Sequence, residues 1–255
     1  MSPEVEKTAR QAVIDGWQKV YPGDAPTLEE IQAIQSIGAL EGQYGLGWRD
    51  HASPVTGLIT SMEGSHNWGS IQCTCKPVDG VCCDGCGYWY DSMPTADGQK
   101  YFEQCFHKYA SPADGAAGII KFLSNYKGVM AVLSTGDLDE IAWQMRLGHY
   151  FLGFNTDPRK SAEAYAVGLD KRAAATADAL GEERKAYRKG GAEAHPDGYD
   201  ASDTPGEEGQ DGADGETNWP GIIADALVSA ASLGLIVGGA VVARKAWKNR
   251  SKKAA

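Results

Sequence analysis

Glu41 is the residue of this chain whose setting best suits acid–base chemistry. It lies in the segment 39–48, where this single carboxylate is followed at once by a glycine-rich turn with two aromatic residues. Three residues before it share its helical face: Ile31, Ile34 and Gly38. A carboxyl group held against apolar surface has its ionised form disfavoured, so its pKa rises towards that of a general acid. The alternative is a glutamate that reaches solvent where its helix ends.

A second candidate lies in the segment 63–72, where Asn67 and Trp68 precede Gly69, Ser70 and Ile71. An amide and an indole beside a tight turn suit a sugar subsite. Flat aromatic faces stack on pyranose rings, and amides bind hydroxyl and acetamido groups. Alternatively, Trp68 belongs to the core and Asn67 only shapes the turn.

Helices must position these groups. Thr27 and Glu30 form a capping-box pattern that predicts a helix from Leu28 to Glu41. The pair Ser2-Pro3 predicts the start of an earlier helix. Further helices are predicted at 99–109, 112–126, 138–147 and 157–180. The segment 42–98 is rich in Gly, Pro, Cys and Asp, which predicts loops with a small β-hairpin around Tyr88–Tyr90.

Six cysteines occur, five of them within positions 73–86: Cys73, Cys75, Cys82, Cys83, Cys86 and Cys105. An even number favours disulfides that hold a loop without a core of its own, with 15 possible connectivities. The alternative is a tetrahedral zinc site, with His66 or His107 nearby in sequence. Vicinal Cys82 and Cys83 cannot easily face one ion together, so we expect disulfides and no metal.

Four motifs in order resemble those of glycoside hydrolase family 73, the flagellar-type and autolysin-type N-acetylglucosaminidases. The first spans 41–45 and the second 67–71. The third, at 106–111, is similar to the family's F-R-x-Y-x-S, and the fourth, at 153–158, is similar to G-Y-A-T-D-P. The resemblance covers roughly residues 27–180 of the chain.

This resemblance implies a lysozyme-like fold and cleavage of the β-1,4 bond after N-acetylglucosamine in peptidoglycan, with Glu41 as the acid. The family's second carboxylate should precede Phe106 by about a dozen positions, where this chain has no glutamate. Asp91 is the nearest match, and Asp84 and Asp97 are alternatives. Help for the oxocarbenium-like centre then comes either from a water activated by Asp91 or from the substrate's own acetamide oxygen.

The motifs also imply a set of substrate-binding residues: Tyr44, Asn67, Trp68, Tyr109, Phe154 and Tyr150. Phe154 stands where the family has a tyrosine, so the ring is kept and the hydroxyl is lost. Tyr150 is the candidate to supply that hydroxyl. His107 stands where the family has an arginine. No cofactor is expected.

The charge is distributed unevenly. The formal net charge of −10 argues against a general nucleic-acid binder. Residues 191–217 hold nine acidic side chains and no Lys or Arg, whereas residues 244–253 hold six basic side chains and no acid. High acidic charge and low hydrophobicity predict a disordered linker at 182–218.

Residues 226–243 form a run of 18 without a charge. At about 1.5 Å per residue this run spans roughly 27 Å, close to the hydrocarbon core of a bilayer. We therefore expect a transmembrane helix at 219–243 rather than a buried core helix. The basic tail at 244–255 would face the cytoplasm, and the N-terminal domain would lie on the other side or in a virion. Gly234 and Gly238 have a spacing that suits pairing in a homo-oligomer.

The expected fold class is α+β, mainly α. A lysozyme-like helical domain would span 1–181, with a Cys-rich β/loop lobe at about 64–105. The expected function is a membrane-tethered peptidoglycan hydrolase. The alternatives are a lytic transglycosylase, a non-catalytic wall-binding domain, and a membrane-associated structural protein of a virion.

Overall fold

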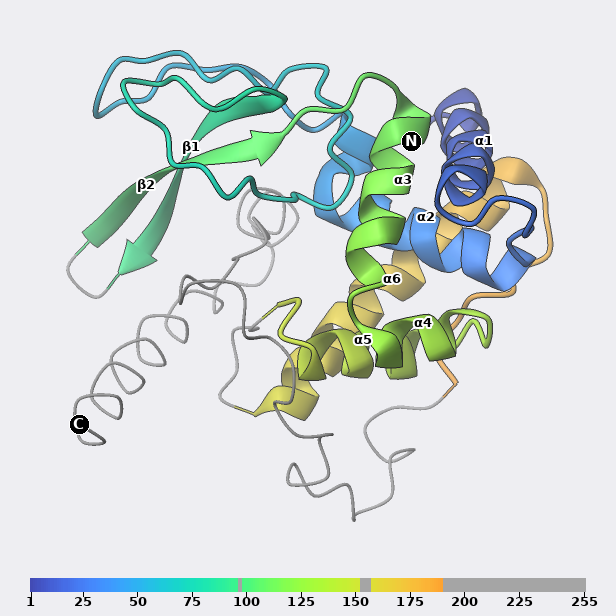
Figure 1. The fold of residues 1–255 in the computed structure, drawn as a ribbon. Coiled ribbons are helices and arrows are strands. Elements are labelled where there is room, and N and C mark those ends of the chain that lie inside the picture. The colour runs from blue at the N-terminus through green and yellow to red at the C-terminus, as the bar shows by residue number, and fades with distance from the viewer. Residues whose placement is uncertain (96–97, 152–156, 190–255) are drawn as a thin grey trace.

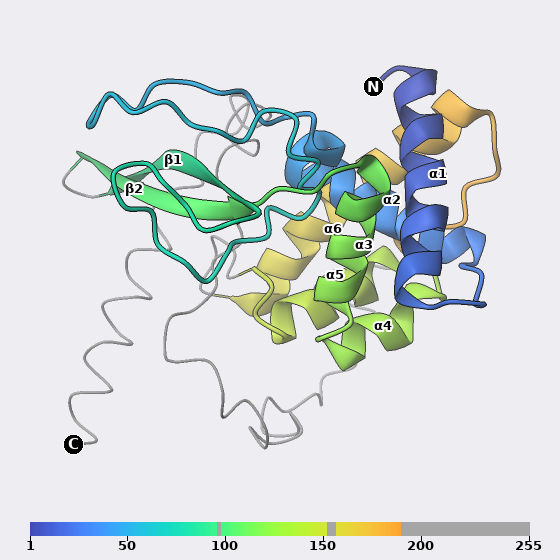
Figure 2. The same cartoon turned by 45° about the horizontal axis from the view of Figure 1, so that its top comes forward.

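The computed structural model describes residues 1–95, 98–151 and 157–189, with the side chains of 91–100 left out. Figure 1 shows the helices gathered on one side and a two-stranded antiparallel sheet with long loops on the other. Figure 2, turned from that view, keeps the same separation, with α1 beside α3. The described chain is thus mainly α within an α+β class, as predicted.

The elements follow in chain order. The helices are α1 (Pro3–Val20), α2 (Leu28–Gly42), α3 (Pro112–Leu123), α4 (Lys127–Leu133), α5 (Leu138–Leu147) and α6 (Pro158–Leu180), with a short 3-10 turn η1 (Gln43–Gly45) after α2. The strands are β1 (Cys86–Thr95) and β2 (Gly98–His107), paired from Cys86 opposite His107 to Thr95 opposite Gly98.

The predictions for α1, α2, α5, α6 and the hairpin strand at Tyr88–Tyr90 are confirmed. The helix predicted at 99–109 is wrong, because those residues form β2 and pair with β1. The helix predicted at 112–126 ends at Leu123, and a separate α4 follows it.

Helix α2 runs through the centre of the helical part. Its capping box is present: Glu30 N–H donates to Thr27 Oγ1 over 3.2 Å, and Thr27 N–H donates to Glu30 Oε2 over 2.7 Å. Nearly every residue from Ile31 to Gly42 is buried, and α1, α3 and α6 all contact this helix. The single apolar face expected from the sequence is therefore part of a helix that is buried on most sides.

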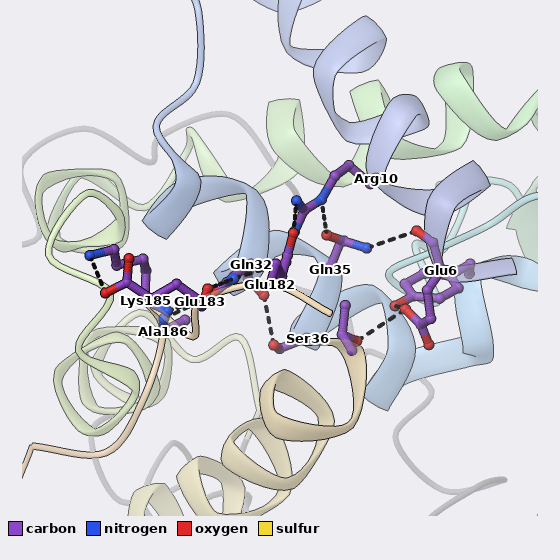
Figure 3. A network of polar contacts seen from close by, with 11 residues as sticks. Glu6, Arg10, Gln32, Gln35, Ser36, Glu182, Glu183, Lys185 and Ala186 are labelled. Atoms are coloured by element: carbon purple, nitrogen blue, oxygen red, sulfur yellow. Dashed lines mark hydrogen bonds and ion pairs between the residues drawn. The ribbon is translucent and has the colours of Figure 1, made fainter. Parts of the chain in front are cut away.

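Three polar residues of α2 lie in that interior and all have partners (Figure 3). Gln32 donates from Nε2 to the Glu183 carbonyl over 2.8 Å and accepts at Oε1 from the backbone N–H groups of Lys185 and Ala186. Gln35 accepts from Arg10 and donates to the Glu6 carbonyl. Ser36 donates to the carbonyl of Gln32.

Residues 182–189 pack onto the helical domain, although the sequence assigned them to the linker. The guanidinium of Arg10 on α1 binds the Glu182 carboxylate through two nitrogens. Tyr187 exchanges backbone hydrogen bonds with the start of α5, donating to the Gly136 carbonyl and accepting from Leu138 N–H. The domain therefore continues to at least residue 189, because these contacts satisfy backbone groups on both segments.

Three disulfides connect the β/loop lobe: Cys73–Cys86, Cys75–Cys83 and Cys82–Cys105. The expectation of disulfides is met in this structure, and no cysteine is left free.

The structure bears on the membrane prediction only for the residues it describes. Among them, no helix combines the length and the apolar character needed to cross a bilayer. The predicted span at 219–243, with Gly234 and Gly238, lies outside the described residues, as do the acidic block and the basic tail.

Candidate active site

Glu41 sits in the last turn of α2, where the helix stops abruptly. Gln43 takes the left-handed conformation at φ 50°, and Tyr44 follows at φ 60°. Two successive left-handed residues turn the chain sharply away from the helix axis, which leaves Glu41 at the end of a buried helix. A carboxylate at a helix C-terminus also faces the negative end of the helix dipole, which disfavours its ionised form.

The Glu41 carboxyl is almost fully enclosed, with 6% of the residue exposed. Burial raises its pKa from 4.5 to about 7, an effect that a hydrogen bond from Tyr165 partly offsets. That bond runs from the Tyr165 hydroxyl to Glu41 Oε1 over 2.5 Å. The other oxygen, Oε2, is buried and has no hydrogen-bond partner among the described residues. Glu41 therefore has one oxygen held by a donor and one oxygen without a partner among the described residues.

Tyr165 lies on α6, and its ring packs against that of Phe151. The rings of Phe151 and Tyr165 stack with centroids 4.3 Å apart and planes 20° from parallel. Burial, the negative charge of Glu41 and their hydrogen bond raise the pKa of Tyr165 well above its usual value. Tyr165 therefore stays protonated and acts as a permanent donor to Glu41.

Tyr150 supplies a second hydroxyl to this region. It is fully buried, and its hydroxyl has no hydrogen-bond partner among the described residues. Burial, together with the negative charge of Glu41, raises its pKa well above the usual value. Its ring packs edge-on against Phe122 and Tyr126. A buried hydroxyl and a buried carboxyl oxygen without protein partners each cost free energy, so each is a candidate to bind an ordered water or a ligand.

Glu6 is a useful contrast, because it is also a buried carboxylate. Its Oε2 accepts from the Tyr44 hydroxyl over 2.6 Å and from Thr176 Oγ1 over 3.0 Å. Burial and the Glu6 carboxylate raise the pKa of Tyr44. The sequence placed Tyr44 in substrate binding, but here its hydroxyl joins α1, η1 and α6. The Glu6 carboxylate thus joins elements of the fold. The Glu41 carboxyl differs, because its Oε2 has no hydrogen-bond partner among the described residues.

Asn67 and Trp68 also lie in the interior rather than on a surface open to sugar. The Asn67 amide donates to the carbonyls of Ile71 and His107 and accepts from Ile71 N–H. Trp68 is 0% exposed. A Cβ on Gly38 would stand 2.6 Å from its ring, and one on Gly115 would stand 2.8 Å from it. The alternative reading from the sequence, a core tryptophan and a turn-forming asparagine, fits this geometry.

The remaining predicted site residues are scattered. Tyr109 packs its ring and hydroxyl against Gly118 of α3, and burial raises its pKa to about 12. Asp91 lies on β1 opposite Phe102, but its side chain is outside the description. Phe154 lies outside the described residues altogether. Of the predicted site residues, Tyr44 and Trp68 lie ring against ring with centroids 4.9 Å apart, and the charge of Glu41 acts on Tyr150.

Tyr165 is the partner that the sequence did not identify as a site residue. It lies on the face of α6 that also carries Ala162, Ala166, Leu169 and Ala173, all of them buried. A single tyrosine hydroxyl on a face otherwise made of small and aliphatic residues was the available signal, because a buried hydroxyl needs an acceptor.

Two solved structures are similar to this chain. One is a C-terminally truncated glycoside hydrolase domain of FlgJ from Salmonella typhimurium, at 17% identity over 68% of this chain and 95% of that chain, with a TM-score of 0.40. The other is the catalytic domain of the autolysin Auto from Listeria monocytogenes, at 16% identity over 71% of this chain and 86% of that chain, with a TM-score of 0.43. No family model matches the sequence, and neither does any curated protein.

Proposed function

We propose that this chain is a glycoside hydrolase of peptidoglycan and that Glu41 is its general acid. The observation that carries the proposal is the state of the Glu41 carboxyl. Its pKa of about 7 leaves a large protonated fraction at neutral pH, as proton donation requires. The resemblance of segments 41–45, 67–71, 106–111 and 153–158 to glycoside hydrolase family 73 motifs supports the substrate class.

In this proposal the two carboxyl oxygens of Glu41 have different tasks. Oε1 accepts from Tyr165, whose donor fixes the orientation of the group. A proton on Oε2 has no acceptor among the described residues, so the glycosidic oxygen of a bound glycan would be its acceptor. The proton moves from Oε2 to that oxygen, and the bond from the anomeric carbon breaks. Water then adds to the anomeric carbon and gives its proton to Asp91 or back to the Glu41 carboxylate. Since only 6% of Glu41 is exposed, glycan binding has to shift its neighbours locally.

The proposal also requires a second group that assists the anomeric carbon, and there are two candidates. Either Asp91 activates the water or the acetamide oxygen of the substrate attacks first. The Asp91→Asn variant separates these two routes. A rate that falls by about 100-fold or more supports Asp91 as the base, in the range typical of general-base loss. An unchanged rate supports the acetamide route.

The Glu41→Gln variant tests the central claim. Its amide oxygen can still accept from Tyr165, so the fold should persist while the proton donor is lost. We expect no lysis of peptidoglycan in a zymogram or a turbidity assay, with an unchanged circular dichroism spectrum. Glu6→Gln is the matched control: it alters another buried carboxylate, and the folded fraction should keep its lytic activity. Lysis by Glu41→Gln at the wild-type rate would refute the assignment.

Product analysis distinguishes hydrolysis from its alternatives. Reducing N-acetylglucosamine ends, detected by mass spectrometry of digested peptidoglycan, are expected from a glucosaminidase. Anhydromuramyl ends would instead identify a lytic transglycosylase, which also needs a single acid. Binding to peptidoglycan without any new ends would identify a wall-binding domain.

The membrane tether is part of the same proposal. The uncharged run at 226–243 and the basic residues that follow it support an anchor that keeps the enzyme near its substrate. The full chain should sediment with membranes or lipid vesicles, and a chain that ends at residue 189 should stay in the supernatant. Equal partitioning of the two chains would contradict the anchor.

A further inference from the structure

Four of the six cysteines bring their sulfur atoms together in the β/loop lobe. The Sγ atoms of Cys73, Cys75, Cys83 and Cys86 all lie within 4.8 Å of one another. One pair belongs to a C-x-C segment and the other to a C-x-x-C segment. The disulfides Cys73–Cys86 and Cys75–Cys83 each join one segment to the other. Both segments thus present their sulfurs to a common point.

We propose that these four sulfur atoms, in their reduced form, bind one soft divalent cation such as Zn²⁺ as a tetrahedral thiolate site. A zinc–sulfur distance of about 2.3 Å places neighbouring sulfurs about 3.8 Å apart in a tetrahedron. Cys83 Sγ and Cys86 Sγ, which are not bonded to each other, already lie 3.5 Å apart. Rearrangement from two disulfides to the metal site needs shifts of only about an ångström per sulfur.

The position of Cys82 removes the main objection to such a site. Vicinal cysteines cannot easily face one ion, but Cys82 is bonded to Cys105 on β2 and takes no part in the cluster. Of the vicinal pair, only Cys83 therefore has its sulfur near those of the other three cluster residues. In the disulfide form the Cys82–Cys105 bond directs the Cys82 sulfur towards β2 and away from the four.

The backbone around the cluster suits thiolate charge. The N–H of Cys83 points at Cys75 Sγ over 3.3 Å, and a hydrogen bond to a charged sulfur is stronger than one to a neutral sulfur. Cys73 N–H donates to the Cys105 carbonyl over 2.8 Å, which fixes the C-x-C segment to β2. Cys83 is exposed and the other three are half-buried, so a reductant and a metal ion can both reach the site.

The chemistry balances in two steps. A phosphine reductant transfers two electrons to each disulfide, giving two thiols per disulfide and a phosphine oxide whose oxygen comes from water. The four thiols then release four protons as they bind one M²⁺, which leaves the site with a charge of −2. A newly made chain in a reducing cytosol has its cysteines as thiols, so the metal form would precede the disulfide form. This proposal does not depend on the role of Glu41.

The test uses the full chain, reduced with a phosphine and titrated with Co²⁺ in the absence of oxygen. We expect one cobalt per chain, with the visible bands and sulfur-to-metal charge transfer of a tetrahedral thiolate, and competition by Zn²⁺. The double variant C75S/C83S should weaken binding by more than the roughly 10–100-fold loss typical of removing an outer-shell partner. The double variant C82S/C105S removes two thiols that lie outside the cluster and should keep the cobalt spectrum.

Three results would overturn the proposal. The first is a reduced wild-type chain that shows no tetrahedral thiolate spectrum, an outcome that does not depend on how any variant folds. The second is a full-strength spectrum in C75S/C83S. The third is loss of the spectrum in C82S/C105S when its circular dichroism shows a folded chain.

Discussion

The hydroxyl of Tyr165 on α6 lies 2.5 Å from Oε1 of Glu41 at the end of α2. The two residues are 124 positions apart in the chain. This bond opposes the effect of burial on the pKa of Glu41, because it favours the ionised carboxylate. The proton affinity of the proposed acid therefore depends on how α6 packs against α2.

The raised pKa of Glu41 predicts a pH-dependent stability. A carboxyl whose pKa rises from 4.5 in the unfolded chain to about 7 in the folded chain stabilises the fold fully below pH 4.5. That contribution is lost as the pH rises through 7, and it amounts to about 3 kcal/mol. Urea unfolding of the wild type between pH 4.5 and 8 should show this fall, and Glu41→Gln should lack it. Parallel pH curves for the two proteins would contradict the assigned pKa.

Removal of the Tyr165 hydroxyl should move the pH profile of activity. In Tyr165→Phe the ionised form of Glu41 loses a donor, so its pKa rises further and the alkaline decline in lysis shifts to higher pH. The variant should lose about 1–3 kcal/mol of stability, more at pH 8 than at pH 5, because hydrogen bonds to charged groups are the stronger ones. If the alkaline decline in lysis by Tyr165→Phe stays at the wild-type pH, the ionisation of Glu41 does not cause that decline.

Tyr150→Phe is the informative companion to that variant. The Tyr150 hydroxyl has no partner in the described residues, so its removal should leave stability unchanged or slightly raise it. A loss of lysis with unchanged stability would then mean that this hydroxyl acts on the bound glycan. If Tyr150→Phe destabilises the fold by more than about 1 kcal/mol, the hydroxyl has a structural partner.

Tyr44→Phe should behave as a structural variant. Its hydroxyl donates to the buried Glu6 carboxylate, so its loss should reduce the free energy of unfolding by about 1.5–3 kcal/mol. The lytic rate of the folded protein at low temperature should stay near the wild-type rate. A lower rate at unchanged stability would restore Tyr44 to the substrate-binding set.

Gly38→Ala tests the packing of Trp68 on α2. In an open helix this change would stabilise by about 1 kcal/mol, but here the new methyl group would stand 2.6 Å from the Trp68 ring. We expect a net loss of about 1–3 kcal/mol, as for overpacked cores. Gly168→Ala on α6 is the control, because its methyl group would meet only the Leu40 side chain, at 3.2 Å. Equal effects of the two changes would contradict this account.

The sequence predicted most accurately the features that depend on residues close together in the chain. The Thr27–Glu30 box and the Asp157-Pro158 start fixed the beginnings of α2 and α6, because capping depends on residues three or four positions apart. The segment 99–109 was misassigned because its aromatic residues suit either a helix or a strand, and pairing with β1 decides between them.

The site was predictable only in part, for a related reason. Glu41 stood out by its place at the end of an apolar face, but its donor lies on a helix far along the chain. The motif residues Asn67 and Trp68 were predicted either as a sugar subsite or as a turn and a core side chain, and both are fully buried. Burial depends on the fit of distant segments: Gly38 and Gly115 leave room for the indole, and a local pattern does not report that fit.

The packing of residues 182–189 has a mechanical consequence. Any pull transmitted from the chain beyond residue 189 first reaches the contacts of Lys189 with Thr135 and of Arg188 with Asp139 and Asp170. The hydrogen bonds between Tyr187 and the start of α5 follow, and the Arg10–Glu182 pair comes later. All of these contacts lie between residue 189 and the C-terminus of α6. Force on the C-terminal chain would be borne by these contacts, and the joint between α6 and α2 that holds Glu41 would stay unstrained until they gave way.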